Sequence, residues 1–133
     1  MNRRREGSAA GFTLIEMLIV VVILGILVTI ASPKFSATKQ KSFVATMVSD
    51  LRNVRDAQER YFSGNDDYYN GPIPNVAFDF EPTKNVTVTL ESVSAAGWAA
   101  TSSYSGGPQT CAIYYGAAAP PAPAVVGGVP ACN

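Results

Sequence analysis

The sequence predicts an α+β protein in which a long amino-terminal helix, membrane-spanning in its first half, packs against a small antiparallel sheet of three or four strands. An apolar run of about 20 residues, long enough to cross a bilayer, extends from Phe12 to Ser32. An amphipathic helical pattern follows this run, and segments of strand-like alternation begin after residue 85. A chain of 133 residues has room for one modest domain with an extension.

Composition argues against an enzyme. Ten basic residues balance ten acidic ones, and the chain has no histidine and two cysteines, Cys111 and Cys132. The Ser-His-Asp and Cys-His nucleophile systems and histidine or multi-cysteine zinc sites are therefore excluded. The sequence also lacks the G-x-x-x-x-G-K-[ST] loop that binds nucleotide phosphates. We expect no catalytic residues, no cofactor, no metal and no direct nucleotide binding.

The apolar run follows a short basic segment, residues 1–11, that contains Arg3, Arg4 and Arg5. By the positive-inside rule, the amino terminus stays in the cytoplasm and the rest of the chain is exported. Three simpler interpretations are a secretory signal peptide, a plain membrane anchor and the buried core helix of a soluble protein. The run is longer than a signal-peptide core, an anchor gains nothing from the acid at Glu16, and the basic flank argues against a core helix.

Glu16 is the one charge between Phe12 and Ser32. A charge well inside lipid costs roughly 2–4 kcal/mol, so this carboxylate requires a partner. Cleavage between Gly11 and Phe12 would create an α-amino group one helical turn away, and Glu16 could neutralise it. The amine could belong to the same chain or to an adjacent copy. Pairing with an adjacent copy would favour assembly in register.

The string GFTLIE at residues 11–16, followed by the apolar run, resembles the amino-terminal signature of type IV pilins and type II secretion pseudopilins. The resemblance covers roughly residues 11–35. It implies that a prepilin peptidase cleaves after Gly11 and methylates the new terminal residue, Phe12. It also implies that Glu16, together with Thr13, guides the docking of subunits.

The resemblance divides the chain into a leader peptide (1–11), an apolar transmembrane and filament-core segment (12–33) and a globular head (34–133). It implies a structural subunit that polymerises through its first helix into a type IV pilus for adhesion, twitching motility or DNA uptake. The implied partners are other copies of the chain, the prepilin peptidase, an inner-membrane platform protein with its assembly ATPase, and membrane lipid before assembly. The precursor would cross the inner membrane once with a periplasmic head, and the mature chain would become part of an extracellular fibre.

Two alternatives remain open. The first is a type II secretion pseudopilin that builds a short periplasmic pseudopilus. Such pseudopilins typically carry an acidic calcium site near the carboxy terminus, whereas no acid follows Glu91 here. The second is a membrane-tethered binding module that never polymerises, whose amino terminus would still be Met1.

Gly25 and Pro33 weaken the first half of the helix. Gly25 costs about 1 kcal/mol relative to alanine, and Pro33 can neither donate to the Thr29 carbonyl nor avoid a clash with it. One interpretation is a simple kink where the helix leaves the membrane. The other, which the resemblance favours, is a segment that stretches or melts when subunits pack into a filament.

After Pro33 the apolar residues recur at helical spacing, in one stripe expected to contact the core. This stripe consists of Val44, Met47, Val48, Leu51, Val54, Tyr61 and Phe62. We expect the helix to run from about Phe12 to Phe62 and to stop at residues 63–65. Residues 65–85 read as an irregular connection, and their four acids match no EF-hand spacing, so we expect them to be solvated.

Three strands are expected at residues 86–93, 98–104 and 110–116, joined by short turns into an antiparallel meander. The residues expected to cover the helix stripe are Trp98, Ile113 and either Tyr115 or Tyr114. The proline-rich tail should be loop, enclosed by Cys111 and Cys132. Outside the cytoplasm two cysteines commonly form a bridge, here worth about 3 kcal/mol, and many pilins bracket this region with a disulfide.

Overall fold

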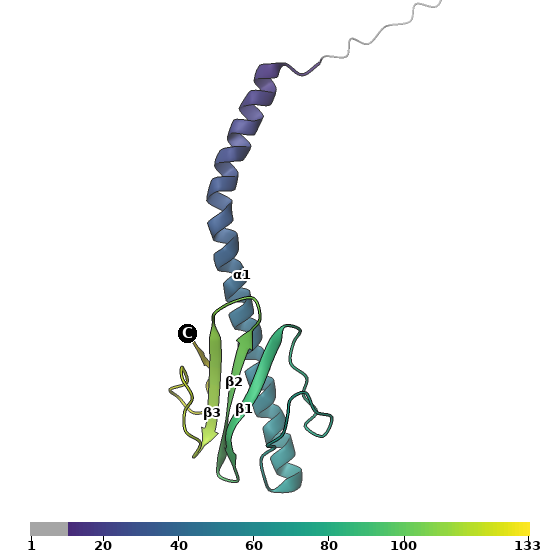
Figure 1. The fold of residues 1–133 in the computed structure, drawn as a ribbon, viewed down its shortest axis with the longest axis vertical. Coiled ribbons are helices and arrows are strands. Elements are labelled where there is room, and N and C mark those ends of the chain that lie inside the picture. The colour runs from purple at the N-terminus through teal and green to yellow at the C-terminus, as the bar shows by residue number, and fades with distance from the viewer. Residues whose placement is uncertain (1–10) are drawn as a thin grey trace, which may run out of the picture. The chain divides into compact units, whose positions relative to one another are not determined.

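The computed structural model describes residues 11–133 and confirms the α+β fold, with one long helix and a four-stranded antiparallel sheet (Figure 1). The chain divides into two compact units, one ending at Ala37 and the other, the head, comprising Thr38–Asn133. The elements are α1 (Leu14–Asn65), β1 (Val86–Ser94), β2 (Gly97–Tyr104), β3 (Thr110–Gly116) and β4 (Ala131–Cys132).

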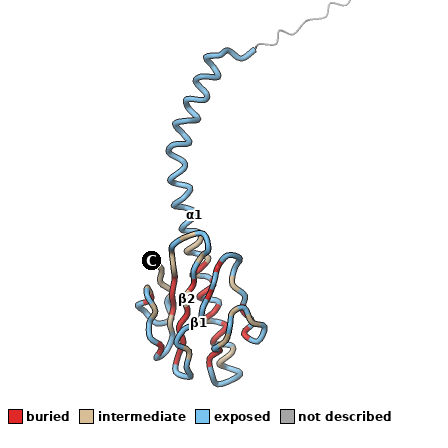
Figure 2. The backbone as a smooth tube through the Cα atoms, in the orientation of Figure 1, coloured by how far each residue is buried: buried red, intermediate tan, exposed pale blue. Residues whose placement is uncertain are grey.

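The part of α1 up to Ala37 is exposed at every position, as the uniform colour of this segment in Figure 2 shows. The helix is continuous through both Gly25 and Pro33. The Thr29 hydroxyl donates to the Gly25 carbonyl at 2.8 Å, while the Thr29 carbonyl loses its usual donor because Pro33 has no N–H. Melting of this segment in a filament stays a prediction, because it concerns the assembled state.

The predicted end of α1 was three residues too early, since the helix continues to Asn65. The Asn65 side chain donates to the Tyr61 carbonyl at 2.8 Å, and the Asp66 amide donates to the Phe62 carbonyl at 2.9 Å. Asp66 adopts a left-handed conformation with φ 54°. The helix is therefore capped by Asp66, and Gly64 is one of its residues.

The sheet has the order β1-β2-β3-β4, and each neighbouring pair is antiparallel. The three predicted strands are confirmed to within a residue of their boundaries. The short strand β4 was not predicted. It pairs Cys132 with Cys111 and Ala131 with Ala112, so the chain end returns to the sheet.

The core of the head lies between the second half of α1 and one face of the sheet. The stripe on α1 is confirmed, because Met47, Leu51 and Val54 are fully buried and its other members pack partly buried against this core. The predicted contacts Trp98 and Ile113 are also fully buried.

Of the two alternative tyrosines, Tyr115 lies on the same face of β3 as Ile113 but at its margin, 41% exposed. Its ring meets Tyr68 edge-on, with ring centroids 6.4 Å apart. Burial raises the pKa of Tyr68, and the nearby Glu59 charge adds to this effect. Tyr114 points to the opposite face, where its hydroxyl donates to the Val125 carbonyl at 3.4 Å.

Two buried polar side chains of α1 fix the connection between α1 and β1. Gln58, fully buried, donates from Nε2 to the Tyr69 carbonyl at 3.0 Å and accepts from the Tyr69 amide at 2.9 Å. Asp50, 2% exposed, accepts from the Thr83 amide and hydroxyl, both at 2.9 Å. The connection is irregular, as predicted, but it is anchored at both ends.

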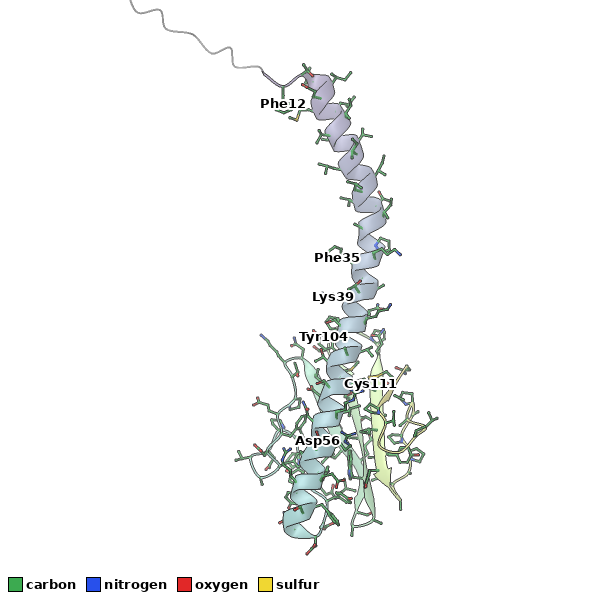
Figure 3. The ribbon with its side chains drawn as sticks, turned by 180° about the vertical axis from the view of Figure 1, so that it is seen from behind. Phe12, Phe35, Lys39, Asp56, Tyr104 and Cys111 are labelled. Atoms are coloured by element: carbon green, nitrogen blue, oxygen red, sulfur yellow. A yellow bond between two sulfur atoms is a disulfide. The ribbon has the colours of Figure 1, made fainter. Side chains whose placement is uncertain are left out.

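The carboxy-terminal loop is fixed to β3. A disulfide joins Cys111, labelled in Figure 3, to Cys132, as predicted. Beside it, the Asn133 side chain accepts from the Thr110 amide at 2.9 Å, and the Asn133 amide donates to the Thr110 carbonyl at 3.2 Å. The tail is therefore closed into a loop whose two ends are adjacent on the sheet.

Candidate functional site

The start of α1 is built as a capping box around Thr13 and Glu16. Thr13 immediately precedes the first helical residue, Leu14, and Glu16 is the third residue of the helix. The Glu16 amide donates to the Thr13 hydroxyl oxygen at 3.3 Å. In return, Glu16 Oε2 accepts from the Thr13 amide and from the Thr13 hydroxyl, both at 2.8 Å. This reciprocal arrangement satisfies amides at the helix start that would otherwise have no partner.

The structure shows Glu16 hydrogen-bonded to Thr13 of the same chain, while its predicted pairing with the α-amino group of a cleaved chain stays a prediction. We did not anticipate the capping box, although its T-x-x-E spacing was visible in the sequence. Both bonds to the carboxylate end on Oε2, and Oε1 accepts no hydrogen bond from residues 11–133. One oxygen of the carboxylate is thus available for a second interaction.

The residues on either side of Thr13 are strongly exposed. Phe12, labelled in Figure 3, is 77% exposed, and Leu14 is 92% exposed. Gly11 has open space around its Cα, with no atom near the position that a Cβ would take. The remainder of the predicted leader, residues 1–10, lies outside the described part of the chain. Residues 11–133 therefore leave the predicted cleavage point between Gly11 and Phe12 accessible to an enzyme.

The apolar side chains that follow are covered by nothing in the described chain. Fifteen large apolar residues between Phe12 and Ile30 are each at least 45% exposed. Helix α1 is also long and apolar enough, by length and composition, to cross a membrane. An apolar surface of this extent is unfavourable in water, so it must be covered by lipid or by other protein.

The head contains shallow surface depressions, one of them with a volume of about 460 Å³. Its lining comes from the connection between α1 and β1, namely Pro74, Asn75, Val76, Asp79, Phe80 and Glu81. Asp79 lies 3.8 Å from the Arg60 guanidinium, and Asp66, Asp67, Asp79 and Glu81 are all exposed. Within residues 11–133, no group of three or more His, Cys, Asp or Glu side chains is arranged to hold a metal ion.

Comparison with known proteins supports the importance of the first helix. Residues 8–32 match the model of the prokaryotic N-terminal methylation motif. The chain is 31% identical over 101 residues to the type IV wide pilus major component PilA4 of Thermus thermophilus, which spans 75% of this chain and 77% of that protein.

Other relatives match mainly over a shorter stretch. Identity to the type II secretion system core protein G of Aeromonas hydrophila is 37% over 68 residues, which is 51% of this chain and 46% of that protein. Identity to the type IV major pilin protein PilA of Myxococcus xanthus is 43% over 58 residues, 44% of this chain and 26% of that protein. The pilin-like fold, the methylation motif and the extended match to the Thermus protein all agree. The chain belongs to the family of type IV pilins and type II secretion pseudopilins, whose members are structural proteins and not enzymes.

Proposed function

We propose that this protein is a structural subunit of a type IV pilus. The observation that carries the proposal is the extent of the match to the Thermus pilus component, which covers 101 residues and so includes much of the head. The methylation motif alone covers residues 8–32 and is compatible with either branch of the family. A likeness in the head is more informative, because the head forms the surface by which such filaments differ.

In this proposal the precursor is held in the inner membrane by the exposed apolar part of α1, with its amino terminus in the cytoplasm and its head in the periplasm. A prepilin peptidase removes residues 1–11 and methylates Phe12. The uncovered apolar side chains then transfer from lipid to a helical assembly of identical chains, which supplies the cohesion of the fibre. The platform protein and the ATPase would drive the transfer.

Glu16 sets the register of this assembly. Its Oε2 is used by the capping box with Thr13, while Oε1 is available to the α-amino group of Phe12 on a neighbouring copy. Both interactions can therefore coexist, and the helix start does not need to unravel for the pair to form. Removal of the pairing would leave the amine without its counter-charge inside an apolar assembly, which is unfavourable.

The test is a comparison of Glu16→Ala with Thr13→Ala in the native host. We expect Glu16→Ala to be cleaved and held in the membrane but absent from sheared surface fibres. Thr13→Ala weakens the helix start by about 1 kcal/mol but keeps the carboxylate, so it should reduce the fibre yield much less than Glu16→Ala does. Normal fibre yield from Glu16→Ala, measured by mass spectrometry and electron microscopy, would refute the pairing role.

The second candidate function is a subunit of a type II secretion pseudopilus. It is supported by the match to core protein G, which reaches 37% identity over 68 residues. Against it stand the absence of any acid after Glu91 and the disulfide that closes the tail. Immunogold labelling of long surface fibres would support the pilus, and a strictly periplasmic location would favour the pseudopilus. An amino terminus still at Met1 would instead indicate a tethered binding module.

A further inference from the structure

The connection between α1 and β1 contains an Asn-Gly pair, Asn70-Gly71, with the properties of a chemical modification site. Asn70 is exposed, and its side chain makes no hydrogen bond with residues 11–133. The backbone amide of Gly71 likewise donates to no acceptor in this part of the chain. We propose that Asn70 deamidates spontaneously in the folded head and converts to aspartate and isoaspartate.

The reaction needs only the chain and water. The Gly71 backbone nitrogen attacks Cγ of Asn70, loses its proton to solvent base and forms a five-membered succinimide, while the Cγ–Nδ2 bond breaks and ammonia leaves with a proton from water. Water then adds to one of the two ring carbonyls and opens the ring. Opening at one carbonyl gives aspartate, and opening at the other gives isoaspartate. Glycine favours the attack because it has no side chain to crowd the nitrogen.

The other four internal asparagines of the described chain lack this combination of features. Asn53 precedes a helical residue, whose amide is held within α1. Asn65 precedes Asp66, whose amide donates to the Phe62 carbonyl at 2.9 Å. In both cases the nucleophilic nitrogen is already bonded, so its reaction would require the helix to open at that point.

The remaining two asparagines are protected in other ways. Asn85 precedes Val86, whose amide donates to the Thr83 carbonyl at 2.9 Å. Asn75 uses its side-chain oxygen to accept from the Ala77 amide at 2.8 Å, and the next residue, Val76, is β-branched. A bulky branched neighbour crowds the attacking nitrogen. Asn70 therefore combines a side chain without a hydrogen bond to residues 11–133 with a following amide that is also without one and belongs to a residue that has no side chain.

The site lies beside an anchored part of the loop. The backbone of Tyr69 is held on both sides by Gln58, and the Tyr69 hydroxyl donates to the Pro72 carbonyl at 3.1 Å. The reaction thus places a new carboxylate, and in the isoaspartyl product an extra backbone methylene, between two held positions. Each modified head gains one negative charge close in sequence to Asp66 and Asp67. Protein molecules that have been in solution for longer would therefore carry more negative charge on the head than newly made ones.

The experiment follows full-length protein in detergent, disulfide intact, during incubation from neutral to mildly alkaline pH. Peptide mapping by mass spectrometry locates acidic products, and enzymatic methylation of isoaspartate quantifies them. We expect the product at Asn70, formed at a rate that rises in proportion to hydroxide. Asn70→Gln should abolish it, because a glutamine would need a larger ring, whereas the control Asn75→Gln should leave it unchanged.

The same incubation in urea supplies the comparison that decides the proposal. We expect similar rates in the folded and unfolded chain, since neither the Asn70 side chain nor the Gly71 amide is held by a hydrogen bond to residues 11–133. A folded rate more than about tenfold slower would mean that the loop must open first and would overturn the proposal. Products that form mainly at Asn75 or Asn85 would also overturn it. None of these outcomes depends on whether the chain forms a pilus.

Discussion

The substitution Gln58→Met tests whether one buried amide holds the connection between α1 and β1. Gln58 is fully buried on α1 and makes two hydrogen bonds, at 2.9 and 3.0 Å, to the backbone of Tyr69. Methionine has a similar volume and helix propensity, so the variant removes the two bonds with little change in packing. Tyr69 is itself buried, 8% exposed, so water does not readily replace the lost amide.

The expected loss of stability follows from the two backbone groups of Tyr69 that are left without a hydrogen-bond partner. A buried donor or acceptor left without a partner costs about 1–3 kcal/mol. The Tyr69 amide and carbonyl together therefore give about 2–6 kcal/mol, and some relaxation of the loop favours the lower half of this range. We expect the free energy of unfolding to fall by about 3 kcal/mol, a large fraction of the roughly 5–15 kcal/mol typical of a domain.

Urea unfolding of the full chain in detergent measures this change, with the fluorescence of the one tryptophan, the fully buried Trp98, as the signal. The matched control is Gln40→Met, which makes the same chemical change on an exposed part of α1. We expect the control to alter stability by less than about 0.5 kcal/mol. If Gln58→Met lost no more stability than Gln40→Met, the hydrogen-bond argument would be wrong.

Two further stability changes are expected from the sheet. Replacement of both Cys111 and Cys132 by alanine opens a loop with a sequence separation of 21 and should lower the free energy of unfolding by about 3 kcal/mol. Reductant should cause a matching loss of stability in the parent chain and none in the variant, which checks that the disulfide is responsible. Ser102→Ala should leave stability unchanged or raise it by up to about 1 kcal/mol, because the buried Ser102 hydroxyl has no hydrogen-bond partner among residues 11–133. A loss above about 1 kcal/mol in the same urea assay would show that this hydroxyl does have a hydrogen-bond partner.

Much of the fold was predictable because hydrophobic periodicity reports burial directly. The spacing of Met47, Leu51 and Val54 identified the buried face of α1, and the alternation from Val86 to Leu90 identified β1. These patterns depend on local geometry, which the sequence contains. The family resemblance likewise rested on a short contiguous string at the helix start.

The features that the sequence analysis did not predict depend mainly on partners that are distant in the sequence. Neither Asp50 nor Gln58 was singled out from the sequence, because each is buried by a loop segment whose position the local pattern does not give. Strand β4 is two residues long and is set by pairing with β3, not by its own propensity. The end of α1 was misplaced because the left-handed residue at its end is Asp66 and not a glycine.

The way in which the two long loops of the head are fastened has a consequence for how this protein can change over generations. The Gln58 side chain is hydrogen-bonded to the main chain of Tyr69, and the Asp50 side chain accepts from the main-chain amide of Thr83. The Asn133 side chain likewise accepts from the main-chain amide of Thr110. Every residue except proline offers the same main-chain donor and acceptor, whatever its side chain. Outward-facing side chains of both loops can therefore change without loss of these hydrogen bonds, and the surface of the head can diversify while its backbone arrangement stays constant.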